Sequence, residues 1–151
     1  DVRILDALQN NSAISSNELA DAAGLSQSPC WRRLQRLLGA GYVKRRVAIL
    51  DREKLGLNVQ IFAMVKLSAH GRANVAEFTR AVTAYPEVLE CHIILGSTDC
   101  LLRIVTTSMQ AYEAFFFNKL SILPGVQEVQ SNVALSEGKY STALPLTRIK
   151  G

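Results

Sequence analysis

The sequence is poor in the features that mark membrane and secreted proteins. No apolar run among its 151 residues approaches the ~18 that a membrane-spanning helix needs. The opening residues, "DVRILDAL", lack the basic-then-apolar plan of a signal peptide. The three cysteines, Cys30, Cys91 and Cys100, are odd in number and show no CxxC spacing, which argues against a disulfide framework. We therefore expect a cytoplasmic protein with no membrane partner. Because the chain does not begin with Met, we also expect a few native residues to precede it.

Motifs of catalytic, cofactor and metal sites are missing as well. The chain contains no P-loop, no GxGxxG and no recognisable Ser/His/Asp set. Its two histidines, His70 and His92, are far apart in sequence and have no metal-ligand spacing. Cys91 and His92 are adjacent on a predicted strand and would point to opposite faces. We predict no catalytic residue, no metal and no cofactor, and hence a protein that is not an enzyme.

Acidic residues are absent from one basic segment. Residues 27–46 hold six basic residues and no acidic one, whereas the rest of the chain has eleven basic against thirteen acidic residues. The net charge of +4 is therefore local. A basic segment in an otherwise near-neutral chain predicts a polyanionic partner for that segment.

The first fifty residues have the pattern of three short helices followed by a strand. The first helix falls in "DVRILDALQNN", the second in "SSNELADAAG" and the third in "LSQSPCWRRLQRLLGAG". Ser15 or Ser16 can cap the second helix, and Gly24 can end it in a left-handed conformation. The stretch "YVKRRVAIL" has strand composition. This order, with a tight glycine turn before the third helix, predicts a winged helix-turn-helix.

The helix after such a turn lies in the DNA major groove, with its N-terminal residues at base edges. Gln27 and Ser28 occupy those N-terminal positions. The next two turns contain Arg32, Arg33 and Arg36, which suit phosphate contacts, with Arg32 or Arg33 able to reach guanine. The basic residues of the following strand extend this patch toward the flanking backbone; they are Lys44, Arg45 and Arg46. Cys30 and Trp31 are expected in the core.

The second half follows a different pattern. After a linker at 51–58, strands and helices alternate in the order βαββαβ, which is the ferredoxin-like arrangement. The predicted elements are strand 59–68, helix 72–84, strand 88–95, strand 100–107, helix 109–122 and strand 126–135. We therefore predict an α+β protein with a DNA-binding domain at 1–50, a linker at 51–58 and a ferredoxin-like domain at 59–151.

The first strand of this second domain is apolar on both faces. Ile61, Ala63, Val65 and Leu67 share one face, and Phe62 and Met64 lie on the other. A strand that is apolar on both sides needs cover on both. A second copy of the sheet is the simplest cover, which predicts a two-fold dimer.

The loop "GSTDC" is the candidate ligand site of the second domain. Gly96, Ser97 and Thr98 offer backbone and hydroxyl donors, and Asp99 offers a carboxylate. A free amino acid needs donors for its carboxylate and an acceptor for its ammonium group, and this loop contains both. The same four residue types also form ordinary hairpin turns, so both interpretations stay open.

The whole chain resembles the Lrp/AsnC family (leucine-responsive/asparagine-operon, or feast/famine, regulators). The resemblance is carried by "GLSQSPCWRRLQRL", "ECHIILGSTDCLLRI" and "LPGVQEVQSNVAL". It implies a transcriptional regulator that binds double-stranded DNA and responds to an amino-acid effector. It also implies assembly beyond the dimer, to an octamer. By this resemblance, residues 96–99 border an effector pocket between dimers, and Ser131 and Val133 line it.

Two alternative functions share this layout. A sirohaem-decarboxylase-like enzyme would need substrate-binding His and Arg residues in the second domain, where the only histidines are His70 and His92. The intact basic segment also favours DNA binding over this enzyme. A chromosome-organising protein that wraps DNA with little sequence preference is the second alternative.

Overall fold

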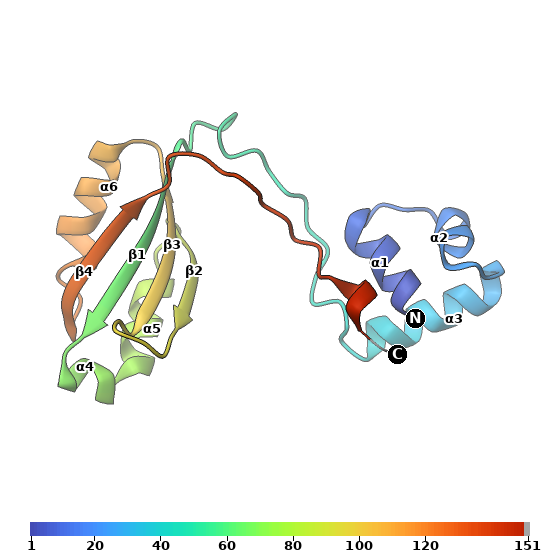
Figure 1. The fold of residues 1–151 in the computed structure, drawn as a ribbon, viewed down its shortest axis with the longest axis horizontal. Helices are drawn as coiled ribbons and strands as arrows, with labels where there is room; N and C mark the ends of the chain where they lie inside the picture. The colour runs from blue at the N-terminus through green and yellow to red at the C-terminus, as the bar shows by residue number, and fades with distance from the viewer. Residues whose placement is uncertain (150–151) are drawn as a thin grey trace. The chain divides into compact units, whose positions relative to one another are not determined.

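The computed structural model describes residues 1–149 and separates the chain into two compact units (Figure 1). Unit 1 consists of Asp1–Ile49 together with the chain from Gly138 onward, and unit 2 consists of Leu50–Glu137. The chain therefore leaves unit 1, forms unit 2 and returns to unit 1.

The N-terminal part of unit 1, residues 1–49, forms three α-helices with the predicted ends. They are α1 (Val2–Asn10), α2 (Ser16–Ala23) and α3 (Gln27–Gly39). Ser15 caps α2 through a reciprocal capping box with Glu18, which satisfies backbone N–H groups that a helix start leaves free. Gly24 ends α2 with φ +68°, a conformation that favours glycine. The predicted helix-turn-helix is thus confirmed, including its caps.

A small apolar core joins the three helices. Its buried members are Ile4, Leu8, Leu19, Ala20, Ala23, Cys30, Leu34 and Leu37. The expected burial of Cys30 is confirmed, whereas that of Trp31 is wrong, because this side chain is 54% exposed. Consecutive residues of a helix lie about 100° apart around its axis, so the residue after a buried Cys30 is turned toward the edge of the core. Trp31 instead lines a pocket of about 150 Å³ with Leu19 and Arg46.

The strand expected after α3 does not form. Residues 43–50 have no regular secondary structure, and all but Val43 are exposed. A strand needs a neighbour to accept and donate its backbone hydrogen bonds, and this segment pairs with no strand in the described part of the chain. Composition alone could not supply the missing partner.

Unit 2 is a four-stranded antiparallel sheet with helices, in the predicted order βαββαβ. Its elements are β1 (Val59–Leu67), α4 (Ala69–Ala73), α5 (Val75–Thr83), β2 (Val88–Ile93), β3 (Cys100–Thr106), α6 (Met109–Phe115) and β4 (Val126–Val133). The strands lie in the order β2-β3-β1-β4. The first predicted helix starts earlier and breaks at Asn74, while the second continues past Phe115 as a π-helical segment, η1 (Phe116–Leu120). The ferredoxin-like fold is confirmed.

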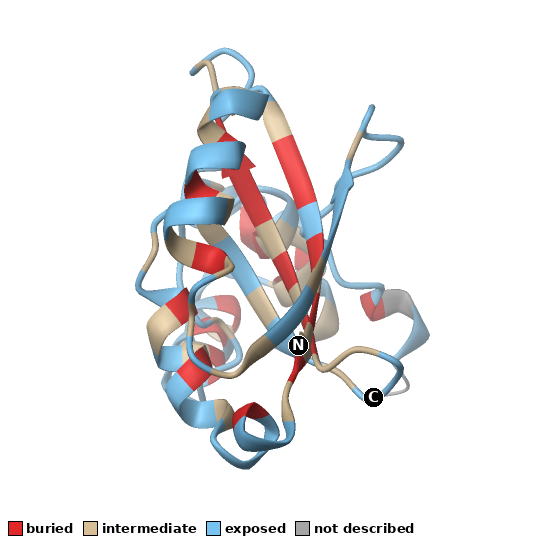
Figure 2. Cartoon of the chain, turned by 90° about the vertical axis from the view of Figure 1, so that its left-hand side faces the viewer, coloured by how far each residue is buried: buried red, intermediate tan, exposed pale blue. Residues whose placement is uncertain are grey.

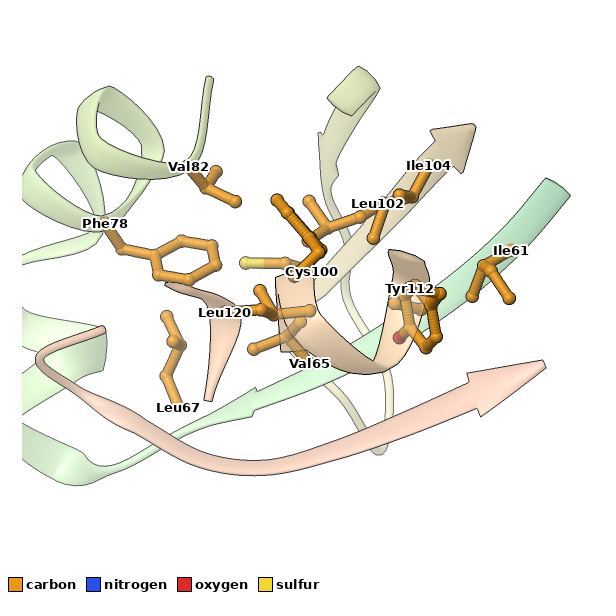
Figure 3. Close-up of a cluster of buried hydrophobic side chains, with 12 residues drawn as sticks. Ile61, Val65, Leu67, Phe78, Val82, Cys100, Leu102, Ile104, Tyr112 and Leu120 are labelled. Atoms are coloured by element: carbon orange, nitrogen blue, oxygen red, sulfur yellow. The ribbon is translucent and has the colours of Figure 1, made fainter. Parts of the chain in front are cut away.

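The core of unit 2 lies between one face of the sheet and the helices. Side chains of β1 and β3 converge there with those of α5, α6 and η1 (Figure 3). Buried residues lie along the central strands, drawn in red in Figure 2. Gly71 and Gly125 allow α4 to approach the turn before β4, since a Cβ on Gly71 would lie 2.5 Å from the carbonyl oxygen of Gly125.

The C-terminal segment packs on α1 of unit 1, which corrects the expectation that the second domain extends to residue 151. The amide of Gln9 donates to the Leu144 carbonyl at 2.9 Å and accepts from the Leu144 N–H at 2.8 Å. Leu146, in the short 3-10 helix η2 (Leu146–Arg148), is only 9% exposed. The sequence carried no signal for this return, because a single glutamine and a single leucine set no periodicity.

Candidate functional site

The outward face of α3 is polar and basic. Cys30, Leu34 and Leu37 form its buried stripe, and Ser28, Arg32 and Gln35 follow the helical spacing i, i+4, i+7 on the exposed side. Gln35 was not among the DNA-contacting residues predicted from the sequence. The signal that could have found it is its position seven residues after Ser28, in line with Arg32.

The six basic residues of the segment 27–46 are exposed, and five of them have no acidic partner within residues 1–149. These five are Arg32, Arg33, Lys44, Arg45 and Arg46. Arg36 differs, because its guanidinium lies 2.5 Å from the Asp1 carboxylate at the start of α1. An exposed pair of this kind contributes little to stability. The segment therefore retains its positive charge for an external partner.

The first residue of α3 is linked to α2 by a side-chain hydrogen bond. The Gln27 amide Nε2 donates to Asn17 Oδ1, and both side chains are exposed. Asn17 was not among the predicted residues, since ten residues separate it from Gln27 and nothing in the spacing pairs them. The bond links the Gln27 amide at the N-terminus of α3 to the first turn of α2.

The loop Gly96–Asp99 lies beside the end of β1, and Asp99 supports it. Asp99 donates its N–H to the Val65 carbonyl at 2.9 Å, and its carboxylate Oδ2 accepts from the Leu67 N–H at 2.7 Å. The Asp99 carboxylate therefore has a structural role within the chain. Its other oxygen, Oδ1, has no hydrogen-bond partner among the described residues.

Gly96 and Ser97 of the loop are exposed, whereas the Thr98 hydroxyl oxygen is buried and has no hydrogen-bond partner among residues 1–149. Buried hydroxyls are rarely left unpaired. The loop thus contains an unused carboxylate oxygen and an unused hydroxyl.

Ser131 and Val133 lie elsewhere on the sheet. Both residues are on β4, where they pair with Ala63 and Ile61 of β1, while the loop joins β2 and β3 on the other side of β1. The Ser131 hydroxyl is hydrogen bonded to the hydroxyl of Tyr112, whose pKa is raised by burial although this bond opposes the rise. One chain therefore does not bring these two residues to the loop.

The face of the sheet away from the helices carries a polar network beside apolar side chains. Arg103 Nε donates to Gln60 Oε1 at 2.8 Å, and its Nη1 donates to Glu90 Oε1 at 3.1 Å. The other oxygen of Glu90 lies 3.0 Å from His92 Nε2. Phe62 lies opposite Arg103 on this face and is 36% exposed.

Within residues 1–149 no helix is long and apolar enough to cross a membrane. In the same part of the chain, no group of three or more His, Cys, Asp or Glu side chains could hold a metal ion.

Comparison with known families and proteins agrees with this architecture. Residues 60–144 match the Lrp/AsnC ligand binding domain, and residues 1–44 match a winged helix-turn-helix DNA-binding domain. The chain is 36% identical over 146 residues to the DNA-binding transcriptional activator DecR of Escherichia coli (strain K12), covering 97% of this chain and 96% of DecR. It is 34% identical to the glutamate uptake regulatory protein of Zymomonas mobilis, covering 97% of this chain and 88% of that protein.

Two solved structures have the same fold. The transcriptional regulator NMB0573 from Neisseria meningitidis, in a complex with L-Met, has a TM-score of 0.91 and 39% identity, covering 96% of this chain and 94% of that one. An AsnC family transcriptional regulator from Agrobacterium tumefaciens has a TM-score of 0.89 and 36% identity, with the same coverages. With its helix-turn-helix unit, its ferredoxin-like sheet and these relatives, the chain belongs to the Lrp/AsnC family of transcriptional regulators.

Proposed function

We propose that this protein regulates transcription by binding double-stranded DNA through α3, and that a small amino acid modulates this binding. The observation that carries the proposal is the helix-turn-helix unit with five basic side chains that have no acidic partner among the described residues. Exposed basic residues on one segment neutralise phosphates, which is the main source of DNA affinity.

On DNA, the N-terminal end of α3 reads the bases and the basic side chains position the helix. Gln27 and Ser28 face base edges, and Arg32 can make the two-pronged contact to guanine. Phosphate contacts come from the remaining basic residues, which are Arg33, Arg36, Lys44, Arg45 and Arg46. Arg36 must leave Asp1 or share it to take part.

The effector site is proposed at the loop Gly96–Asp99, completed by Ser131 and Val133 of another chain. The separation of these groups within one chain, with β1 between them, supports a pocket formed between copies. The free oxygen of Asp99 can accept from an ammonium group, and the donors of Ser97 and Thr98 can bind a carboxylate. A relative named for glutamate uptake and a neighbour solved with L-Met support an amino acid as the ligand.

Assembly is proposed through the open face of the sheet. Phe62 remains 36% exposed there, beside half-buried Met64 and Leu101. A second copy would cover this face in a two-fold dimer and would present two α3 helices to successive half-sites. Further association of dimers, to the octamer, would create the pocket between them. We also propose the cytoplasm as the compartment, in keeping with three free thiols.

A thermal-shift screen of the twenty amino acids tests the effector. A ligand at a hundred times its Kd should stabilise the protein by about 2.7 kcal/mol. A footprinting experiment then tests regulation. We expect protection of one promoter region at a protein concentration that leaves unrelated DNA bare, whereas uniform coating at equal occupancy would indicate a chromosome-organising protein. If none of the twenty amino acids shifted the unfolding temperature, the effector proposal would be contradicted.

A further inference from the structure

We propose that Asn17 is a positioning residue for base recognition, and that it holds Gln27 in the orientation that selects adenine in each half-site. The inference rests on the proposed DNA contact of α3. It concerns a residue on α2 that no sequence motif singles out and that need not touch a base itself.

The geometry of the amide pair carries the argument. A glutamine amide has one acceptor oxygen and two N–H donors. One N–H of Gln27 donates to Asn17 Oδ1. Within residues 1–149 the second N–H and the oxygen of Gln27 have no partner. The remaining acceptor and donor are the pair that adenine requires, since Gln accepts from N6 and donates to N7.

The bond to Asn17 also bears on which way the Gln27 amide faces a base. A free glutamine amide can rotate by half a turn and exchange its oxygen and nitrogen, which presents the opposite pattern to a base. Asn17 turns its Oδ1 toward Gln27, which places the nitrogen of Gln27 on the α2 side. This orientation is kept only while the Asn17 amide itself does not turn, because a turned Asn17 would donate to the Gln27 oxygen instead. The Asn17 Nδ2 group has no partner in the described part of the chain and can donate to a phosphate, and that contact would hold the Asn17 amide in this orientation on DNA.

The placement on the two helices suits this role. Asn17 is in the first turn of α2 and Gln27 is the first residue of α3, so the bond ties together the starts of the two helices. Both side chains are exposed and contribute little to the core, so replacing them should spare the fold. Asn17 and Gln27 thus act on the base specificity of DNA binding rather than on the stability of the fold.

The test uses the full chain, a selection from a random DNA library and then binding measurements on the selected site with each base at each position. The unmodified protein should prefer adenine at one position of each half-site, and Gln27→Ala should abolish that preference alone. Asn17→Ala should weaken the same preference about tenfold. The salt dependence should not change, because no charge is lost.

Asn17→Asp sharpens the test. The aspartate keeps an acceptor for Gln27 and so should keep the adenine preference, while its negative charge should weaken binding to every sequence. Asn17→Ala combined with Gln27→Ala should give the preference of Gln27→Ala alone, because the two residues act as one unit. Asn74→Ala, at an exposed asparagine of unit 2, is the control and should change neither the base preference nor the salt dependence of DNA binding.

A full adenine preference in Asn17→Ala overturns the inference, as does a Gln27-dependent preference for another base. Such a result leaves the proposed function intact if Gln27→Ala still alters specificity. If neither Gln27→Ala nor loss of Arg32 and Arg33 changes DNA binding, the proposed role of α3 fails as well. Thermal unfolding of each variant confirms that the fold is kept.

Discussion

The two units differ in how their charged side chains are paired. In unit 1, Arg32, Arg33 and the three basic residues after α3 have no acidic partner within residues 1–149. In unit 2, Arg103 binds Glu90 and Gln60, Lys119 lies 3.6 Å from Glu87, and Asp99 binds the backbone of β1. Unit 2 uses several of its charges to hold itself together, although its exposed Arg72 and Arg80 have no acidic partner within residues 1–149. In the basic segment of unit 1, five of the six positive charges have none.

This difference indicates which charged residues face an external partner. A paired charge has a structural explanation already, and its removal should be felt first as a loss of stability. Unpaired charges that cluster on one segment, as at 32–46, have no such explanation, and their removal should be felt as a loss of binding. Whether a charged side chain has a partner within the chain therefore separates stabilising residues from binding residues better than its type does.

The largest effect is expected for the double variant Arg32→Ala with Arg33→Ala. DNA affinity should fall by about tenfold or more for each arginine lost. The salt dependence should become shallower by about 0.9 for each phosphate contact removed. Fluorescence anisotropy with a labelled duplex at several salt concentrations measures both quantities.

The control for this variant removes the same charge from unit 2. Arg72→Ala with Arg80→Ala also deletes two exposed arginines. If both double variants weakened DNA binding equally, net charge alone would explain the affinity and the comparison between the units would be lost.

The next effect concerns the return of the chain to unit 1. Leu146→Ala should destabilise unit 1 by about 2 kcal/mol, because it empties the space of a leucine that is 9% exposed. Leu144→Ala is the matched control, since that side chain is 67% exposed and only its backbone binds Gln9. Denaturant unfolding measures both. Equal stabilities of the two variants would mean that the C-terminal segment adds nothing to unit 1.

A smaller effect separates the two roles of Asp99. Asp99→Ala removes the acceptor of the Leu67 N–H and should destabilise unit 2 by about 1–3 kcal/mol. Asp99→Asn keeps an oxygen for that bond and should leave the stability close to that of the unmodified chain. It should nevertheless weaken the response to the amino acid found in the screen, because an ammonium group needs the negative charge. An unchanged effector affinity in Asp99→Asn would make Asp99 a purely structural residue.

Sequence reasoning succeeded where local chemistry decides the structure. The caps of α2, the glycine turn before α3 and the order of strands and helices in unit 2 all follow from residue type and spacing over a few positions. The family itself could be identified from the chain alone.

It failed where a distant or missing partner decides. The segment 43–50 has strand composition but no strand beside it. The contacts of Asp99 with β1, of Gln9 with Leu144 and of Gln27 with Asn17 join residues between 10 and 135 positions apart. A hydrogen bond across such a distance leaves no period in the sequence, so these contacts could be found only in the folded chain.

The smallest effect tests the paired charges of unit 2 through pH. The hydrogen bond from His92, followed by the bond and charge of Arg103, holds the pKa of the Glu90 carboxyl below its usual value of 4.5 although partial burial opposes this. Below pH 4.5 the unfolded chain therefore takes up a proton at this group before the folded chain does. The stability that Glu90 contributes is complete above 4.5 and is lost as the pH falls through the lowered pKa of the folded state.

Glu90→Gln should therefore flatten the fall in stability as the pH drops from above 4.5 through the lowered pKa of Glu90 in the folded state. His92→Ala, which removes the largest cause of the lowered pKa, should flatten it in part. The change is small because the Glu90 side chain is 44% exposed and solvent screens its charge. Urea unfolding across this pH range measures it, with Glu77→Gln, at an exposed carboxylate of α5, as the control. If Glu90→Gln and Glu77→Gln gave the same profile, the network of Arg103, Glu90 and His92 would contribute no stability, and the contrast with the unpaired charges of unit 1 would rest on geometry alone.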